Sequence, residues 1–218
     1  MKYKKHSLLV VIAMSLLISV SAQDFKGGFC AGPVVTQYNG DNKGGYSKIG
    51  PKAGFFVRRV MPGKWNYQLD LIYVQKGSKY EYIDDNSSYY DYYNLRLRYI
   101  EAPLTFQYVT DKIEVPGLFR LSFGTDIAFE IGLGAAYLLE AKEDDDGGGW
   151  LNEPIRPFKK YDITGHVGVA YWFNPHLAVN FRYSYSILPV RDHPGGQTWL
   201  IDLGEYNNVL HFSLYYAF

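Results

Sequence analysis

The sequence has one cysteine in 218 residues, and after residue 22 it has no apolar run long enough for a transmembrane helix. The single thiol, Cys30, excludes an internal disulfide, so the fold must hold without one. The sequence also lacks an excess of either charge, because it has 22 basic and 22 acidic residues. That balance gives no reason to expect nucleic acid binding.

The first 22 residues have the pattern of a secretory signal peptide. A basic start at Lys2, Lys4 and Lys5 precedes an apolar run over 8–20, and the small residues Ser21 and Ala22 follow. An uncleaved anchor helix is the alternative, but the run is shorter than the roughly 20 residues that span a bilayer. We therefore expect cleavage before Gln23 and a mature domain over 23–218 with a formal charge of −3. No cysteine stands directly after the cleavage point, where Gln23 lies instead, and this argues against a lipoprotein anchor.

Tyrosine, phenylalanine and glycine are abundant, with 21, 13 and 22 copies, a composition that favours strands and turns. The clearest pattern covers 161–187, where apolar residues at odd positions alternate with small or polar residues around a turn at Asn174-Pro175. A period of two over about 12 residues per segment predicts an antiparallel hairpin of membrane-crossing length. A soluble sandwich would have shorter strands, and its core could not be built from the polar face.

Similar segments recur along the chain, and their number is even, as expected of an outer-membrane barrel. We predict an all-β, antiparallel, up-and-down transmembrane β-barrel with eight strands near 25–37, 47–60, 65–81, 95–109, 127–141, 160–173, 176–189 and 207–218. Short links at Pro62-Gly63 and Asn174-Pro175 alternate with long polar links at 39–46, 82–94, 142–159 and 190–206. The link at 110–126 is unusually long for a periplasmic turn. In the fourth strand, Leu95 and Leu97 share parity with Glu101, which predicts a bulge near Tyr99 or apolar residues under the rim.

Several segments, in this order, resemble the PorT-like outer-membrane β-barrel family of Bacteroidetes. They are QLDLIYVQKGSK (68–79), YIEAPLTFQY (99–108), GLGAAYLLEAK (132–142), residues 161–188 and the closing VLHFSLYYAF (209–218). The resemblance implies an eight-stranded barrel in the cell outer membrane and no established general activity. One member of that family takes part in type IX protein secretion, so an accessory role in a secretion or envelope assembly is an alternative function.

The first candidate site is the barrel interior, toward which Cys30 and several ionisable residues should point. They could form a polar pathway or proton-linked site, but eight strands enclose little more than side chains, so we favour a structural network of paired charges. The ionisable set is Lys26, Lys52, Arg58, Asp70, Glu101, Glu130, Asp162, His166, Arg182 and His211.

Two loops are further candidates. The tyrosine-rich loop 80–93 could bind a surface glycan or protein, or it could be an aromatic girdle with an exposed rim that extends the strands above the membrane. It contains Tyr80, Tyr82, Tyr89, Tyr90, Tyr92 and Tyr93 with Asp84, Asp85 and Asp91. The acidic run 143–149 has carboxylates that suit calcium, but its spacing does not match an EF-hand, so a flexible surface loop is favoured.

Enzymatic catalysis is the remaining class of function. Ser186, Asp192 and His193 are close in sequence, as a lipid-modifying hydrolase would require, but such proximity is common by chance. We expect no enzymatic activity, no catalytic residues, no cofactor and no metal. The expected partners are outer-membrane lipid and the barrel insertion machinery, which would read the terminal strand ending at Phe218.

Overall fold

The computed structural model describes residues 25–40, 45–84, 89–110, 126–145, 147–151, 154, 156–192 and 204–218. The predicted signal peptide and most of the link at 110–126 lie outside these residues, and both stay predictions. Among the described residues, no helix is long and apolar enough to cross a membrane.

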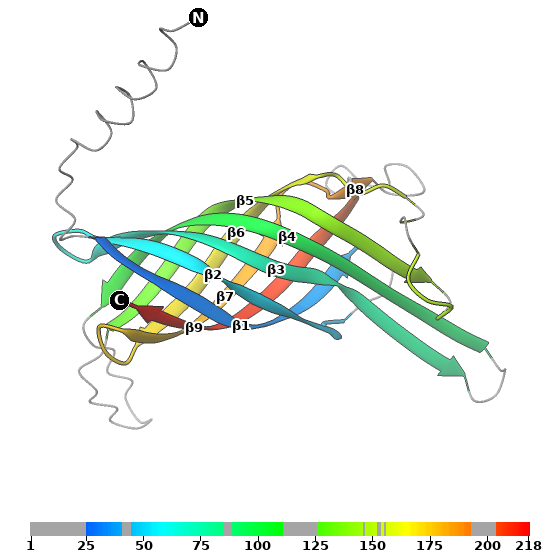
Figure 1. Ribbon diagram of the computed structural model, residues 1–218, viewed down its shortest axis with the longest axis horizontal. Helices are drawn as coiled ribbons and strands as arrows, with labels where there is room; N and C mark the ends of the chain where they lie inside the picture. The colour runs from blue at the N-terminus through cyan, green and yellow to red at the C-terminus, as the bar shows by residue number, and fades with distance from the viewer. Residues whose placement is uncertain are drawn as a thin grey trace, which may run out of the picture.

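The described residues form nine strands, eight of which close into an antiparallel ring (Figure 1). The order around the ring is β1 to β7 and then β9, and β9 pairs back onto β1. The ninth element, β8, is a two-residue strand that pairs with the start of β9. The predicted barrel of eight strands is confirmed. The strands are Phe25–Asn39 (β1), Lys48–Val60 (β2), Trp65–Asp84 (β3), Tyr89–Thr110 (β4), Asp126–Asp145 (β5), Tyr161–Trp172 (β6), Leu177–Ser186 (β7), Arg191–Asp192 (β8) and Gly204–Ala217 (β9).

Both predicted short turns lie at the end of the barrel where β1 starts and β9 finishes. In the β6–β7 turn, the Asn174 side-chain oxygen accepts hydrogen bonds from the backbone N–H groups of His176 and Leu177, both at 2.9 Å. In the β2–β3 turn, Gly63 takes a φ of +99°, which favours glycine. Short turns mark the periplasmic end of an outer-membrane barrel, so the opposite end is extracellular.

The outer surface carries two aromatic levels separated by an apolar band. Trp65 packs against Tyr108 at 5.0 Å between ring centroids near the periplasmic turns, and Tyr137 packs against Tyr161 at 5.4 Å toward the other end. Tyr161 and Tyr171 are ten positions apart on β6, a separation that matches the length of a tilted membrane-crossing strand. We call these levels the periplasmic girdle and the outer girdle.

The fourth predicted strand keeps its alternation throughout, so its apolar residues do lie under the rim. Leu95, Leu97, Tyr99 and Glu101 are all buried in the lumen. The register does shift between Arg98 and Tyr99, but the extra residue belongs to β5, because Arg98 pairs with Glu140 and Tyr99 with Leu138.

Beyond the outer girdle, three strands continue as an extension of the sheet. β3, β4 and β5 have 20, 22 and 20 residues, against 10 in β7, and the β3–β4 hairpin projects past the other strands (Figure 1). The predicted links at 82–94 and 142–159 were therefore wrong at their edges, since 82–84, 89–94 and 142–145 are strand. Both faces of these segments carry polar groups, so the sequence shows no apolar alternation there.

Candidate functional site

The lumen holds a buried charge network centred on Arg182, whose side chain is 0% exposed. Its Nη1 lies 2.8 Å from Oδ2 of Asp70, and its Nε lies 2.6 Å from Oε1 of Glu130. The hydroxyl of Tyr215 donates to Asp70 at 3.1 Å, and the amide of Asn180 donates to Glu130 at 2.9 Å. One cation and several neutral donors thus satisfy two carboxylates that water does not reach.

A second buried network lies around Lys76. Its Nζ is 3.0 Å from Glu101 and 3.5 Å from Asp162. Thr164 donates to Glu101 at 2.8 Å, and Ser186 donates to Asp162 at 3.0 Å. Lys76 was missing from the predicted inward set. The alternation that places Asp70 in the lumen also places Ile72, Val74 and Lys76 there, so the signal was present in the sequence.

The lumen charges in the membrane-spanning part balance. Four buried cations, Lys52, Arg58, Lys76 and Arg182, face four buried carboxylates, Asp70, Glu101, Glu130 and Asp162. His166 and His211 are buried among them, with ring centroids 6.4 Å apart. Every residue predicted to point inward is buried, except Lys26, which is half-buried at the periplasmic end.

The Arg58 and Lys52 side chains of this set lie over aromatic rings. The guanidinium of Arg58 stacks over the Trp172 ring at 3.8 Å. Lys52 Nζ lies 5.6 Å from the Tyr215 ring and has no hydrogen-bond partner among the described residues, but it is within electrostatic range of Asp70 and Glu130.

Apolar layers lie on both sides of these networks. The periplasmic layer includes Cys30, Phe56, Ile72, Ala128, Ala170, Trp172, Ala178, Tyr215 and Ala217. The outer layer includes Val34, Tyr38, Val74, Leu95, Leu97, Tyr99, Leu138, Phe158, Val190 and Val209. Cys30 is a free, buried thiol, as predicted. Side chains thus fill the lumen as a layered core.

A third charge network caps the extracellular mouth. Arg191 lies 3.0 Å from Glu143 and also contacts Glu205, which is 2.5 Å from Arg156. The Tyr93 hydroxyl donates to Glu143 at 2.7 Å. Burial raises the pKa of the Tyr93 phenol well above its ordinary value, so this group remains a donor at neutral pH.

The acidic run 143–149 was expected to be a flexible loop, but its first three residues are strand, whereas 147–149 lie outside the strand and are exposed. Glu143, Asp144 and Asp145 belong to β5, and Glu143 and Asp144 are buried. The Asp144 carboxylate accepts a hydrogen bond from the backbone N–H of Gly149 at 3.1 Å. Across the part of the chain that the structure describes, no three His, Cys, Asp or Glu side chains are grouped as a metal site would need.

The tyrosine-rich segment is a strand hairpin rather than a loop. Tyr82 and Tyr90 are each 48% exposed, and Tyr90 stacks on Tyr92 with ring centroids 6.1 Å apart. Tyr93 points instead into the mouth network. Asp85 lies outside the described residues, as do the side chains of Asp84 and Tyr89.

The hydrolase candidates are not brought together. Ser186 is buried in the lumen, where it donates to Asp162, whereas the Asp192 side chain is 81% exposed and pairs with Lys159 at 2.8 Å. His193 lies outside the described residues. At the end of the terminal strand, Phe218 is 70% exposed and packs against Phe29; its recognition by insertion machinery stays a prediction.

A closed antiparallel ring with an apolar outer band and a packed lumen defines a small membrane β-barrel. A model of the outer membrane protein β-barrel domain matches residues 14–191, and the chain belongs to that family. The protein is therefore located in the outer membrane.

Three solved barrels are similar in fold, each at low identity. Ail of Yersinia pestis, solved with the heparin analogue sucrose octasulfate, is 12% identical with a TM-score of 0.44, covering 89% of this chain and 99% of its own. Neisserial surface protein A is 12% identical with a TM-score of 0.47, covering 89% and 97%. The N-terminal barrel of Pseudomonas aeruginosa OprF is 11% identical with a TM-score of 0.34, covering 88% and 97%. No curated protein matches the chain.

Proposed function

We propose that this protein is a non-enzymatic outer-membrane barrel with a structural lumen and an extracellular extension that contacts a partner at the cell surface. The observation that carries this proposal is the hairpin β3–β4, which holds exposed tyrosines on paired strands above the outer girdle. Tyrosines on a rigid backbone supply large amphipathic contact area at a low entropic cost, as in binding surfaces of antibodies.

The outer edge of β3 adds a second means of contact. β2 pairs with β3 from Asn66 to Val74, and side-chain bonds from Thr36 and Ser47 reach the carbonyls of Gly77 and Lys79. Further along, the backbone pairing of β3 within the described residues is with β4 alone. An open strand edge can pair with an extended segment of a partner protein, so a protein partner fits this surface, and a glycan could use the same rings.

The packed lumen supports a structural rather than a conducting role. Balanced buried charges lie between apolar layers that include Phe56 on one side and Leu95 and Leu97 on the other. Purified protein in planar bilayers should therefore give no steady conductance. Reproducible open channels from a monodisperse monomer would contradict the structural role.

Capture of surface partners tests the extension. Tagged protein carrying Tyr82→Ser and Tyr90→Ser should lose a partner that the wild-type barrel retains after cross-linking on whole cells. The matched control is Tyr161→Ser, which removes an exposed tyrosine of the outer girdle and should retain that partner. Equal recovery from all three proteins would exclude the hairpin as the contact surface.

A more specific alternative function is an accessory role in a secretion or envelope assembly, and the PorT-like resemblance over 68–79 and 99–108 supports it. The same capture distinguishes the two, because an accessory subunit should co-purify with large envelope proteins at fixed stoichiometry. A lipid-modifying enzyme receives no support from the positions of Ser186 and Asp192.

A further inference from the structure

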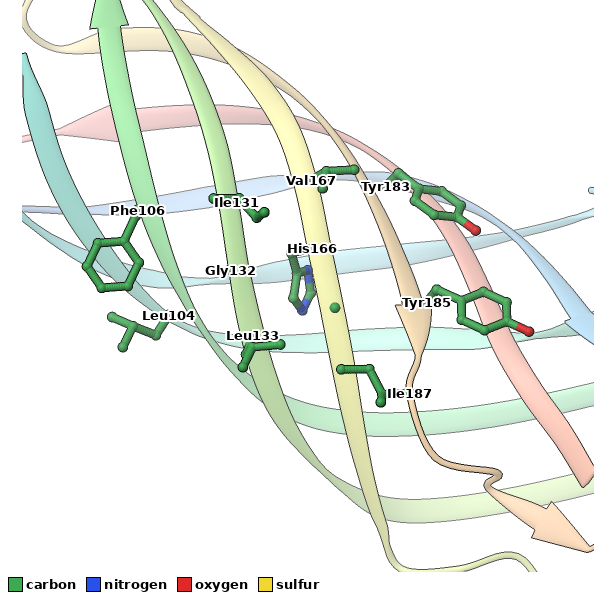
Figure 2. Close-up of a pocket in the computed structure, with 11 residues that line it drawn as sticks. Leu104, Phe106, Ile131, Gly132, Leu133, His166, Val167, Tyr183, Tyr185 and Ile187 are labelled. Carbon is green, nitrogen blue, oxygen red and sulfur yellow. The ribbon is translucent and has the colours of Figure 1, made fainter. Parts of the chain in front are cut away.

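The outer surface of the barrel is hollowed over β4 to β7. A cavity of about 620 Å³ opens there, and Figure 2 shows its lining side chains spread along neighbouring strands, with Gly132 and His166 near the middle of the view. Apolar side chains make most of the lining, including Leu104, Phe106, Ile131, Leu133, Val167 and Ile187. Tyr183 and Tyr185 stand on one flank in Figure 2.

The hollow exists because Gly165 occupies an outward position of β6. Its partners in register are Leu133 on β5 and Tyr185 on β7, both of which carry large side chains. A Cβ added at Gly165 would lie 3.8 Å from the Ile187 side chain, an ordinary contact. The backbone there has room for a side chain, and the sequence places none.

The depth of the hollow identifies its environment. Gly165 lies four residues from Tyr161 in the outer girdle and six from Tyr171 near the periplasmic girdle. The hollow is therefore within the apolar band and nearer its extracellular side. In the outer membrane, that position faces the acyl chains of the outer leaflet.

We propose that this hollow seats one acyl chain of an outer-leaflet lipid, held as a fixed lipid rather than as part of the exchanging annulus. An apolar, concave site of this size suits a flexible hydrocarbon chain, which can follow the curved floor between the side chains. A second barrel presents a convex surface, which cannot fill a concave hollow. The inference is independent of the partner proposed for the extracellular hairpin.

Native mass spectrometry of barrels released from dimyristoyl phosphatidylglycerol nanodiscs tests the site. Wild-type protein should retain one bound lipid at a detergent dose that strips the annulus, and Gly165→Leu should retain it several-fold less often. Ala53→Leu is the matched control, because it adds the same side chain to an exposed outward position of β2, outside the hollow. It should retain lipid as the wild type does.

Folding of each variant is checked by its altered gel migration when unheated, and Gly165→Ala supplies a milder filling if Gly165→Leu fails to fold. Equal lipid retention by all proteins would overturn the proposal. A wild-type dimer that Gly165→Leu converts to a monomer would also overturn it, because the hollow would then be an interface between copies.

Discussion

The membrane-spanning ring and the extracellular extension are one continuous sheet, but different solvents shape them. In the ring, lipid surrounds the outer face, so outward side chains are apolar and the lumen holds the charges. In the extension, water reaches the outer face, and Glu81, Arg98 and Glu140 are partly exposed there. The same backbone pairing therefore carries an apolar outer face in one region and a polar outer face in the other.

The lumen of the ring and the mouth beside the extension should differ most in how much unfolding free energy is lost when a buried cation is removed. Arg182→Ala would leave Asp70 and Glu130 without their shared cation in the lumen, and we expect a loss of about 3–5 kcal/mol in the free energy of unfolding. Arg191→Ala should cost clearly less, because water can enter the mouth and hydrate Glu143 and Glu205. Urea titration of both variants in lipid vesicles measures the difference. Equal losses would show that the mouth is as dry as the lumen.

A charge added at an exposed position should separate the two regions along a single strand. Leu69 lies between Trp65 and Tyr73 on β3, within the apolar band, and Leu69→Arg should cost about 2–4 kcal/mol. Tyr82→Arg, on the same strand beyond the outer girdle, should change the unfolding free energy by no more than about 0.5 kcal/mol. Vesicle-based urea unfolding checks both values. A large penalty at Tyr82 would place the membrane boundary further out than the girdle does.

The base of the extension, where Lys48 of β2 contacts Asn94 of β4, should also show a pH response. Burial, with the neighbouring Arg96 charge adding to it, lowers the pKa of Lys48 to about 8 from the ordinary 10.5. A folded-state pKa below the unfolded one penalises the folded protein at pH 8 and below, and the penalty is relieved as pH rises toward 10.5. We expect stability attributable to Lys48 to rise by about 1–2 kcal/mol between pH 8 and 9.5.

The variant Lys48→Met isolates that response, because it keeps the aliphatic length and removes the charge. The difference in unfolding free energy between wild type and Lys48→Met, measured at pH 7, 8 and 9.5, should shift in favour of the wild type as pH rises. A constant difference would mean that Lys48 is hydrated in the folded protein.

The same contrast explains which parts of the structure the sequence could predict. Strand positions and facing in the ring followed from alternation, as for Phe129, Ile131 and Leu133 outward and Glu130 inward. Alternation alone could not locate the extension, because residues 80–84 and 89–93 pair as strand without an apolar face. The partners of individual charges also escaped prediction, since the contact between Arg182 and Asp70 joins residues 112 positions apart. Such pairs depend on how the ring closes.

The extra residue in β5 decides which charges meet at the mouth. Up to Leu138 the even-numbered residues face the lumen, and after the extra residue Ala141 and Glu143 do, so Glu143 meets Arg191 while Lys142 pairs outside with Glu140. With one residue fewer, Lys142 would turn toward Arg191 and Glu143 would leave it. The mouth network therefore depends on the number of residues in β5 as strictly as on their identity. Deleting one residue there would replace the attraction between Glu143 and Arg191 by a repulsion between Lys142 and Arg191.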